Sequence, residues 1–180
     1  MKLLDMTRKY GNATHEYPFA PYEVAEGFRG KPEYTYELCI GCTACAVACP
    51  SNAMNVQLNE AKDKLVWKFD CGRCIYCGRC DEVCPTGAVA LGDNFETAVR
   101  LNKEDLIETG ELELQACVRC NVNFTTKRLI AYCIENFINV GWSKEQIDHK
   151  AVYIKTCPTC KKEESVGLVV GHFYKGGVVR

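Results

Sequence analysis

The chain has 180 residues, of which 47% are hydrophobic and 25% charged; this length suits one or two compact domains and excludes a large multidomain enzyme. The formal net charge of -1 and the pI near 6.3 exclude a global electrostatic attraction to nucleic acid or to an anionic membrane surface. Fourteen cysteines are the most distinctive feature of the composition.

The first ten residues, MKLLDMTRKY, lack the apolar core of a secretory signal peptide, because Asp5 follows only two leucines. We therefore expect a cytoplasmic protein. Thiols that are not bound to metal stay reduced there, so this many cysteines indicate metal ligands rather than disulfides. No stretch approaches the roughly 18 to 20 consecutive apolar residues that cross a bilayer. We expect any membrane attachment to be indirect, through partner subunits.

Residues 1–36 are predicted to form an extended arm that binds a partner. The stretch YPFAPYEVAEGFRGKPEYTYE (17–37) has three prolines and several aromatic residues but little helical or strand periodicity. Such aromatic side chains favour packing on another surface. This surface is either the chain's own cluster domain or a partner subunit, and the sequence does not decide between the two.

Residues 37–92 contain an internal repeat in which CIGCTACAVACPSNAM (39–54) aligns with CIYCGRCDEVCPTGAV (74–89). Both halves read C-x2-C-x2-C-x3-C-P, the run typical of bacterial ferredoxins. Three thiolates at three-residue spacing on one tight loop can hold three corners of a [4Fe-4S] cubane, whereas the fourth corner lies out of reach of that loop. In two-cluster ferredoxins, the fourth cysteine of each run binds the other cluster.

The repeat therefore predicts two [4Fe-4S] clusters, each of which joins the two halves of the domain. The ligands of the first cluster are predicted to be Cys39, Cys42, Cys45 and Cys84. The ligands of the second cluster are predicted to be Cys74, Cys77, Cys80 and Cys49.

A fifth cysteine in the second run, Cys71, has no counterpart in the first, where the repeat has Tyr36. A shifted ligand set that starts at Cys71 would leave Cys80 without a role and lose the three-residue gap before Cys-Pro. We expect Cys71 to be buried and inert; the alternative is a thiol that substitutes when a ligand is lost.

Between the two runs, AMNVQL and KLVWKF flank the polar stretch NEAKD, and their apolar residues alternate as in a short β-hairpin. We expect a small α+β core of the bacterial two-[4Fe-4S] ferredoxin type, with Trp67 and Phe69 as core residues rather than electron relays. Residues 93–116, which are rich in acidic residues and contain no cysteine or histidine, are predicted to be an acidic connector that wraps this domain.

Residues 117–180 are predicted to form a metal-binding tail with a zinc-ribbon-like or rubredoxin-like site. Two C-x2-C pairs, ACVRCN and TCPTCKK, can present four thiolates in the tetrahedral arrangement that suits Zn²⁺ or a single rubredoxin-type iron. The predicted ligands are Cys117, Cys120, Cys157 and Cys160. Between the pairs, KRLIAYCIENFIN (127–139) has the apolar stripe of a helix. Cys133 belongs to this stripe and is interpreted as a small buried hydrophobic residue rather than a fifth ligand.

The tail is mildly basic, with ten Lys and Arg residues against five Asp and Glu residues. These positive charges are scattered among acidic residues rather than clustered, which disfavours a nucleic-acid-binding zinc ribbon. The chain's three histidines, His15, His149 and His172, have no partners at fixed spacing and are interpreted as surface or packing residues.

Several stretches together resemble one family over nearly the full length: FRGKP, the two cysteine runs, FETAVRLNKEDL, and the late CVRC and CPTC pairs. This family is the two-cluster ferredoxin-type subunit of formate hydrogenlyase and hydrogenase-4 complexes. The two-cluster subunit of respiratory complex I is similar in the FRG-type entry, the double run and the FETAVRLNKEDL-like segment, but it lacks the paired tail.

The resemblance implies an electron relay rather than a catalyst. The implied partners are the iron-sulfur subunit of a formate dehydrogenase, or a similar donor, and the small subunit of a membrane-bound [NiFe] hydrogenase. The implied location is peripheral, on the inner face of the cytoplasmic membrane. The alternatives are a subunit of a complex I-like NADH/ferredoxin:quinone oxidoreductase, a freely diffusing ferredoxin, and a catalytic iron-sulfur enzyme.

Overall fold

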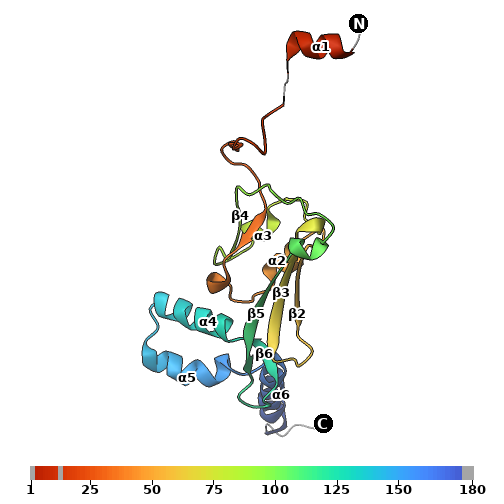
Figure 1. Ribbon diagram of the computed structural model, residues 1–180. Helices are drawn as coiled ribbons and strands as arrows, with labels where there is room; N and C mark the ends of the chain where they lie inside the picture. The colour runs from red at the N-terminus through yellow and green to blue at the C-terminus, as the bar shows by residue number, and fades with distance from the viewer. Residues whose placement is uncertain (1–2, 12–13, 176–180) are drawn as a thin grey trace.

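The computed structural model describes residues 3–11 and 14–175; the ends of the predicted arm and tail, residues 1–2 and 176–180, and residues 12–13 lie outside the described part. The fold is α+β, as predicted (Figure 1). Its helices are α1 (Leu3–Tyr10), α2 (Ala44–Ala48), α3 (Arg79–Glu82), α4 (Lys127–Asn139), α5 (Lys144–Ile154) and α6 (Pro158–Lys175). Its strands are β1 (Pro32–Tyr34), β2 (Met54–Leu58), β3 (Lys64–Asp70), β4 (Val89–Leu91), β5 (Ile107–Ala116) and β6 (Asn123–Thr126). Among the described residues, no helix is long and apolar enough to cross a membrane.

Two antiparallel sheets organise the chain. One has two strands, β1 and β4, and the other has four strands in the order β2-β3-β5-β6. The predicted hairpin is confirmed, because β2 pairs with β3 in the register Met54 with Phe69 and Leu58 with Leu65. The short helices α2 and α3, which follow the two cysteine loops, lie against each other beside this sheet (Figure 1).

The core beside the cysteine loops is aromatic. Trp67 and Phe69 are 2% and 0% exposed, which confirms their prediction as core residues. Tyr34 stacks on Trp67 with 3.8 Å between the ring centroids and 11° between the planes. Gly110 lies opposite Trp67 in the β3–β5 register, and a Cβ atom there would lie 3.0 Å from the Tyr34 ring. The absence of a side chain at this position leaves room for the stacked pair.

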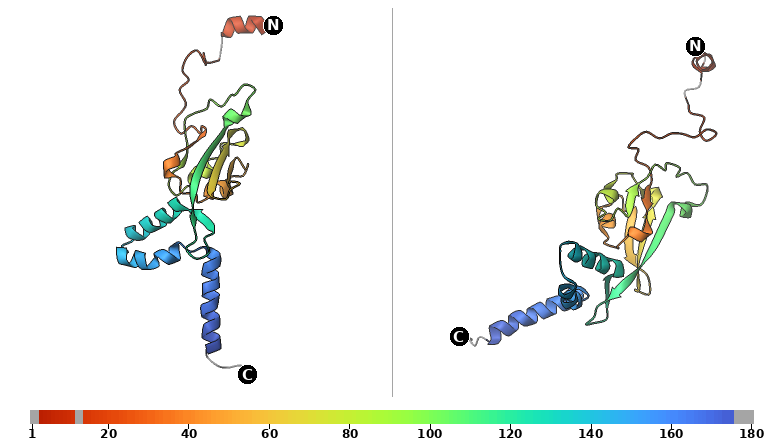
Figure 2. Two further views of the ribbon diagram at one scale, coloured as in Figure 1. Left: turned by 60° about the horizontal axis from the view of Figure 1, so that its bottom comes forward. Right: turned by 90° about the vertical axis from the view of Figure 1, so that its left-hand side faces the viewer.

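Strand β5 occupies much of the segment that was expected to be an acidic connector. Its residues pair with the whole length of β3, from Lys64 opposite Glu113 to Asp70 opposite Ile107. Leu112 and Leu114 are buried while their neighbours in the strand point to solvent, so ELELQ alternates as a half-buried strand does. Beyond β3, the same strand pairs with β6 and carries the chain from the cysteine loops to the C-terminal helices (Figure 2).

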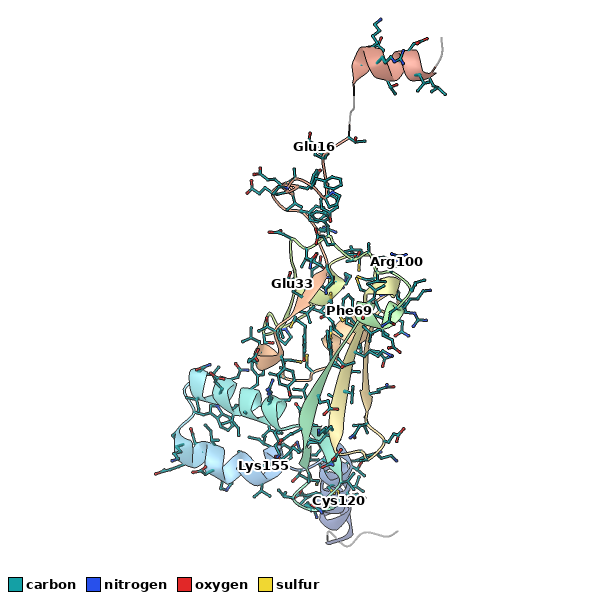
Figure 3. The ribbon with its side chains drawn as sticks, in the orientation of Figure 1. Glu16, Glu33, Phe69, Arg100, Cys120 and Lys155 are labelled. Atoms are coloured by element: carbon teal, nitrogen blue, oxygen red, sulfur yellow. The ribbon has the colours of Figure 1, made fainter. Side chains whose placement is uncertain are left out.

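The N-terminal arm is not uniformly extended. It begins with α1, which buries none of its residues, and ends with β1, which pairs with β4. Between them, Tyr17, Tyr22 and Phe28 surround Phe95 with ring-centroid distances of 5.7, 5.8 and 6.2 Å. This part of the arm therefore packs on its own chain, whereas Phe19 is 96% exposed. Figure 3 shows the arm passing Glu16 and leading away from the sheet.

The helix predicted within the tail is confirmed, since α4 covers 127–139. Its N-cap is Thr126, the last residue of β6, which is only 1% exposed. The Thr126 hydroxyl accepts a hydrogen bond from the Leu129 amide at 3.1 Å and donates one to the carbonyl of Ile40 in the first cysteine loop. One buried hydroxyl thus caps the tail helix and joins it to that loop.

Replacing Thr126 with Val is expected to destabilise the protein by about 1–3 kcal/mol, because the change leaves a buried carbonyl and a helix-terminal amide without partners. The measurement is the thermal midpoint of the metal-loaded protein, followed by circular dichroism at one scan rate. Thr109→Val, on an exposed position of β5, is the control and should leave the midpoint unchanged. Equal midpoints for the two variants would contradict the role of Thr126.

Candidate iron-sulfur and metal centres

Cysteines from both runs meet in two cavities. The first cavity is lined by Cys39, Cys42, Cys45 and Cys84. The second cavity is lined by Cys49, Cys74, Cys77 and Cys80. Each cavity therefore combines three thiols of one run with the last thiol of the other. The structure brings together the two sets of residues that were predicted as ligands; their binding of clusters stays a prediction.

The two cysteine loops repeat not only in sequence but also in backbone conformation. Three positions in each run have positive φ values, and each position in the first run has its counterpart 35 residues later. Non-glycine residues in this left-handed region cost about 1–2 kcal/mol each, and such strain persists mainly at functional sites. The positions are Gly41, Thr43 and Asn52 in the first run and Tyr76, Gly78 and Gly87 in the second, with φ between 53° and 78°.

The last thiol of each run accepts a backbone hydrogen bond. The amide of Ala53 donates to Cys49 Sγ, and the amide of Ala88 donates to Cys84 Sγ, both at 3.2 Å. Burial raises the pKa of both thiols, but the hydrogen bonds outweigh burial, so the pKa of each lies below its ordinary value. The hydrogen bonds therefore favour the thiolate of each cysteine, the form that binds metal.

Two buried polar atoms beside the first cavity have no hydrogen-bond partner among the described residues: Tyr34 Oη and Trp67 Nε1. Trp67 lines this cavity. Burial raises the pKa of the Cys45 thiol, and the adjacent indole N–H acts against that rise; the pKa of Tyr34 is raised by burial and by the neighbouring Cys39. An unsatisfied buried donor costs about 1–3 kcal/mol. The sulfur atoms of an iron-sulfur cluster are acceptors, so the donors and the four thiols fit a [4Fe-4S] group.

Burial raises the pKa of Cys80, in the second cavity, to about 11. This thiol becomes an effective ligand only when a cation compensates its negative charge. Cys71 lies outside both cavities but packs in the same buried cluster as Cys80 and Cys74. Among the described residues it belongs to the aromatic core, with its sulfur 3.4 Å from Tyr76 Oη, and it lines neither cavity.

The four tail cysteines come together at the other end of the sheet (Figure 3, Cys120 and Phe69). Their sulfur atoms all lie within 4.8 Å of one another, and those of Cys120 and Cys157 are 3.7 Å apart. A tetrahedral ion about 2.3 Å from each sulfur would separate the sulfurs by about 3.8 Å. The tail site therefore has the size of a single metal ion. Its four members are Cys117, Cys120, Cys157 and Cys160.

The two pairs of the tail site are held by different elements. Cys117 and Cys120 lie in the turn between β5 and β6. Cys157 directly precedes α6, and Cys160 lies in the first turn of that helix. The second pair thus lies at the start of a helix, whereas the first pair lies in a turn between strands. The amides of Arg119 and Cys157 donate to Cys117 Sγ at 3.4 and 3.2 Å. Although burial opposes ionisation, such bonds lower the pKa of Cys117 to about 6.

The histidines were interpreted as surface or packing residues. His15 packs edge-on against Tyr22, with 4.7 Å between the rings, and His149 is exposed on α5. The side chain of His172 lies outside the described part of the structure.

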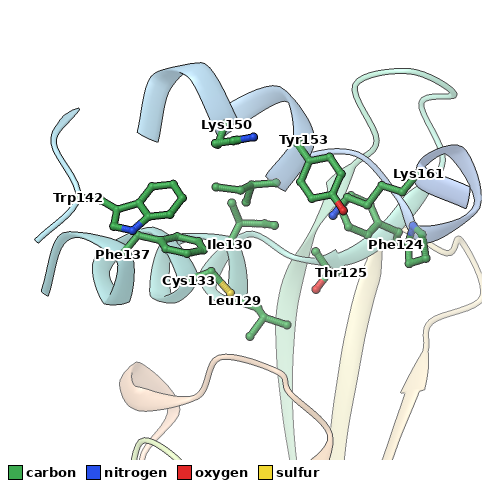
Figure 4. A pocket seen from close by; sticks show the side chains of 12 residues that line it. Phe124, Thr125, Leu129, Ile130, Cys133, Phe137, Trp142, Lys150, Tyr153 and Lys161 are labelled. Carbon is green, nitrogen blue, oxygen red and sulfur yellow. The ribbon is translucent and has the colours of Figure 1, made fainter. Parts of the chain in front are cut away.

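An apolar groove of about 620 Å³ lies between α4, α5 and the start of α6 (Figure 4). Cys133 faces this groove and is not among the tail-site thiols. Two cationic side chains, Lys150 and Lys161, line the groove, and no acidic residue does so within the described part of the chain. The apolar lining comes from Phe124, Leu129, Ile130, Cys133, Phe137, Trp142, Tyr153, Ile154 and Pro158.

The fold and its two shared cysteine cavities define a two-cluster ferredoxin-type protein, and the 4Fe-4S dicluster domain family matches residues 38–88. Formate hydrogenlyase subunit 6 of Escherichia coli K12 is 43% identical over 156 residues, which cover 87% of this chain and 85% of that protein. The chain belongs to the family of two-cluster ferredoxin-type electron-transfer subunits that includes formate hydrogenlyase subunit 6.

Two further relatives match a shorter part of the chain. NAD(P)H-quinone oxidoreductase subunit I of Gloeobacter violaceus is 33% identical over 102 residues, which cover 52% of this chain and 49% of that protein. A chain in the structure of the membrane-bound sulfane sulfur reductase, an archaeal respiratory membrane complex, is 30% identical with a TM-score of 0.42, covering 56% of each chain.

Gly41→Ala is expected to impair the first cysteine loop. A Cβ atom at Gly41 would lie 2.5 Å from Thr126 Cγ2, and Thr126 cannot rotate away without losing its two buried hydrogen bonds. We expect a lower thermal midpoint and less bound iron per protein after reconstitution, measured by inductively coupled plasma mass spectrometry.

Gly87→Ala is the matched control. Gly87 has a similar φ of 65°, but a Cβ atom there would meet nothing within 4 Å. Both substitutions introduce backbone strain of about 1 kcal/mol, so a difference between them measures the contact with Thr126. Equal losses of iron in the two variants would refute the importance of this contact.

Proposed function

We propose that this chain is a non-catalytic electron-transfer subunit that relays single electrons through two [4Fe-4S] clusters inside a membrane-associated complex. The pair of cavities with exchanged cysteines carries the proposal. Cys39, Cys42, Cys45 and Cys84 bind the first cluster. Cys74, Cys77, Cys80 and Cys49 bind the second cluster.

When bound, each cluster accepts one electron and passes it on. The protein's part is to hold the ligands rigidly and to limit the contact of the clusters with water. Trp67, Val89 and Leu112 are at most 2% exposed and line the first cavity. Backbone amides directed at the thiolates stabilise negative charge there. Because each run supplies one ligand to the cavity of the other, the two centres are held close to each other and no conformational change is needed to bring them together.

The proposed donor is an iron-sulfur subunit of a formate dehydrogenase or a similar module, and the proposed acceptor is the small subunit of a membrane-bound [NiFe] hydrogenase. The family supports this choice over a complex I-like subunit, because the match to formate hydrogenlyase subunit 6 covers 87% of the chain and the match to subunit I covers 52%. The proposed location follows from these partners: peripheral, at the inner face of the cytoplasmic membrane.

The proposed tail metal, Zn²⁺ or a rubredoxin-type iron, has a structural role. Its ligands tie the β5–β6 turn to the start of α6, and the amide of Val118 donates to the Lys155 carbonyl at 3.2 Å across the same junction. The metal would hold the C-terminal helices at one orientation relative to the sheet.

The exposed apolar surface of the tail supports membership of a complex. The groove between α4 and α5 is open, and Ile138, Val152 and Tyr153 nearby are each more than half exposed. A mobile electron carrier does not need such a surface, since contiguous exposed apolar patches mark interaction sites. The positive rim of the groove suits a partner segment that combines apolar and acidic side chains.

The metal content of the purified chain tests the ligand assignment. Wild-type protein should contain about eight iron atoms in two clusters and one further zinc or iron ion. Cys71→Ser should keep both the iron content and the electron paramagnetic resonance (EPR) signals of the reduced clusters, because Cys71 lines neither cavity. Loss of a whole cluster from Cys71→Ser would show that this assignment is wrong.

Purification of the tagged chain in gentle detergent tests membership of a complex. Hydrogenase and membrane subunits should co-purify, and Tyr153→Glu, which places a carboxylate in the groove, should lower their yield several-fold. Leu58→Glu, at an exposed position of the hairpin, is the control for an added charge. A clean monomer in the soluble fraction would overturn the proposal, whereas an unchanged yield from Tyr153→Glu would overturn the role of the groove alone.

A further inference from the structure

The two cysteine cavities differ in the electrostatic groups that surround them. The first is lined by thiols, apolar residues and two threonines, with no charged side chain among the described lining residues. Its wall contains Trp67, whose indole Nε1–H is buried and has no acceptor in the described part of the chain. The acceptors that this cavity offers to the donor are the sulfur of Cys45, which the indole N–H faces, and the sulfur atoms of a bound cluster.

A cation from the tail reaches the first loop. Arg128, in the first turn of α4, donates hydrogen bonds to the carbonyl of Tyr36 and, at 3.3 Å, to that of Cys39. Its guanidinium lies over the Tyr36 ring, 4.4 Å from the centroid, and the residue is partly buried. No ion pair neutralises Arg128 in the part of the chain that the structure describes. Its positive charge therefore acts on the first loop with limited screening by water.

The corresponding groups of the second cavity are neutralised or exposed. Arg79 lines that cavity but forms an ion pair with Glu82. Arg29, from the arm, reaches the Cys77 carbonyl at 3.5 Å, but its side chain is exposed to solvent. The Tyr76 hydroxyl near this cavity already has Thr97 as a partner at 3.4 Å. A backbone amide, that of Tyr76, also donates to Cys74 Sγ at 3.4 Å, as the amide of Ala88 does to Cys84 Sγ in the first cavity. The second loop thus receives less positive potential from side chains than the first.

We infer that the cluster bound by Cys39, Cys42, Cys45 and Cys84 has the higher reduction potential of the two, because Trp67 and Arg128 stabilise its reduced form. The inference rests on the proposed function, which supplies the clusters. Reduction adds one electron and no proton, so the centre becomes more negative by one charge. A hydrogen-bond donor and a nearby cation both stabilise that charge, which raises the potential. At equilibrium, a single electron on the chain then resides mainly at the first centre.

The test is an anaerobic redox titration of the full-length, metal-loaded chain, followed by EPR spectroscopy. Two midpoints are expected in the wild type. Trp67→Phe and Arg128→Gln should each lower the higher midpoint and leave the lower one in place. Arg128→Lys keeps the charge and should retain most of the wild-type value. Arg29→Gln should cause at most a smaller shift, confined to the lower midpoint, because water screens its charge.

A control separates the lost donor from a loosened core. Leu114→Ala removes buried apolar volume from the same sheet outside both cavities and keeps the indole N–H, so both midpoints should stay at their wild-type values. Arg128 is only partly buried, so its variant tests the inference even where Trp67→Phe fails to fold.

The inference is overturned if Arg128→Gln shifts the lower of the two midpoint potentials, or if it shifts neither of them. A protein that binds no second cluster gives a single midpoint and a reduced iron content, which overturns the proposed function instead. The two failures are therefore distinguishable in the same preparation.

Discussion

The last cysteine of each run lies in the cavity of the other run, and this exchange constrains everything around it. Cys49 and Cys84 are carried by loops that must cross between the two halves of the repeat. The halves therefore cannot separate without opening both cavities. The backbone accommodates the arrangement with three left-handed positions in each run, at matching places in the repeat. Such strain persists because the surrounding packing over-determines it.

The two cysteine loops have matching backbone conformations, but the residues that contact them from other parts of the chain differ. The first loop rests on β5, β6 and α4, where Gly41 approaches Thr126 and where Arg128 binds the backbone. The second loop meets the N-terminal arm through Arg29 and the segment around Thr97. Two centres with the same ligand pattern thus lie in different electrostatic surroundings, which is a physical basis for different potentials.

Strand β5 joins the tail to the cluster domain through continuous strand pairing. It pairs with β3 beside the first cavity and with β6 beside the tail cysteines, so one strand spans both regions. The tail site at one end and the first loop at the other are therefore connected through continuous hydrogen-bonded structure, with Thr126 at the junction.

Local pattern was sufficient for several elements. The alternation around residues 54–69 predicted the hairpin, and the apolar stripe of 127–139 predicted α4 with its observed ends. The strand at 107–116 was missed because its acidic residues dominated the composition, although ELELQ alternates as a strand does. The helix α1 was missed as well, because the whole arm was interpreted from the prolines and aromatic residues of 17–37, which follow these eight residues.

The sequence by itself predicted the family, the two cysteine sets and the tail quartet, because the spacing within each run or pair is local and the exchange of the last cysteine follows from the ferredoxin repeat. Only the tertiary structure decided which residues surround the loops. The placement of Trp67 beside Cys45, of Arg128 at Cys39 and of the Thr126 hydroxyl at Ile40 each brings together residues at least 22 positions apart. Their roles depend on the pairing of β3, β5 and β6, which no local pattern encodes, because strand pairing is a long-range contact.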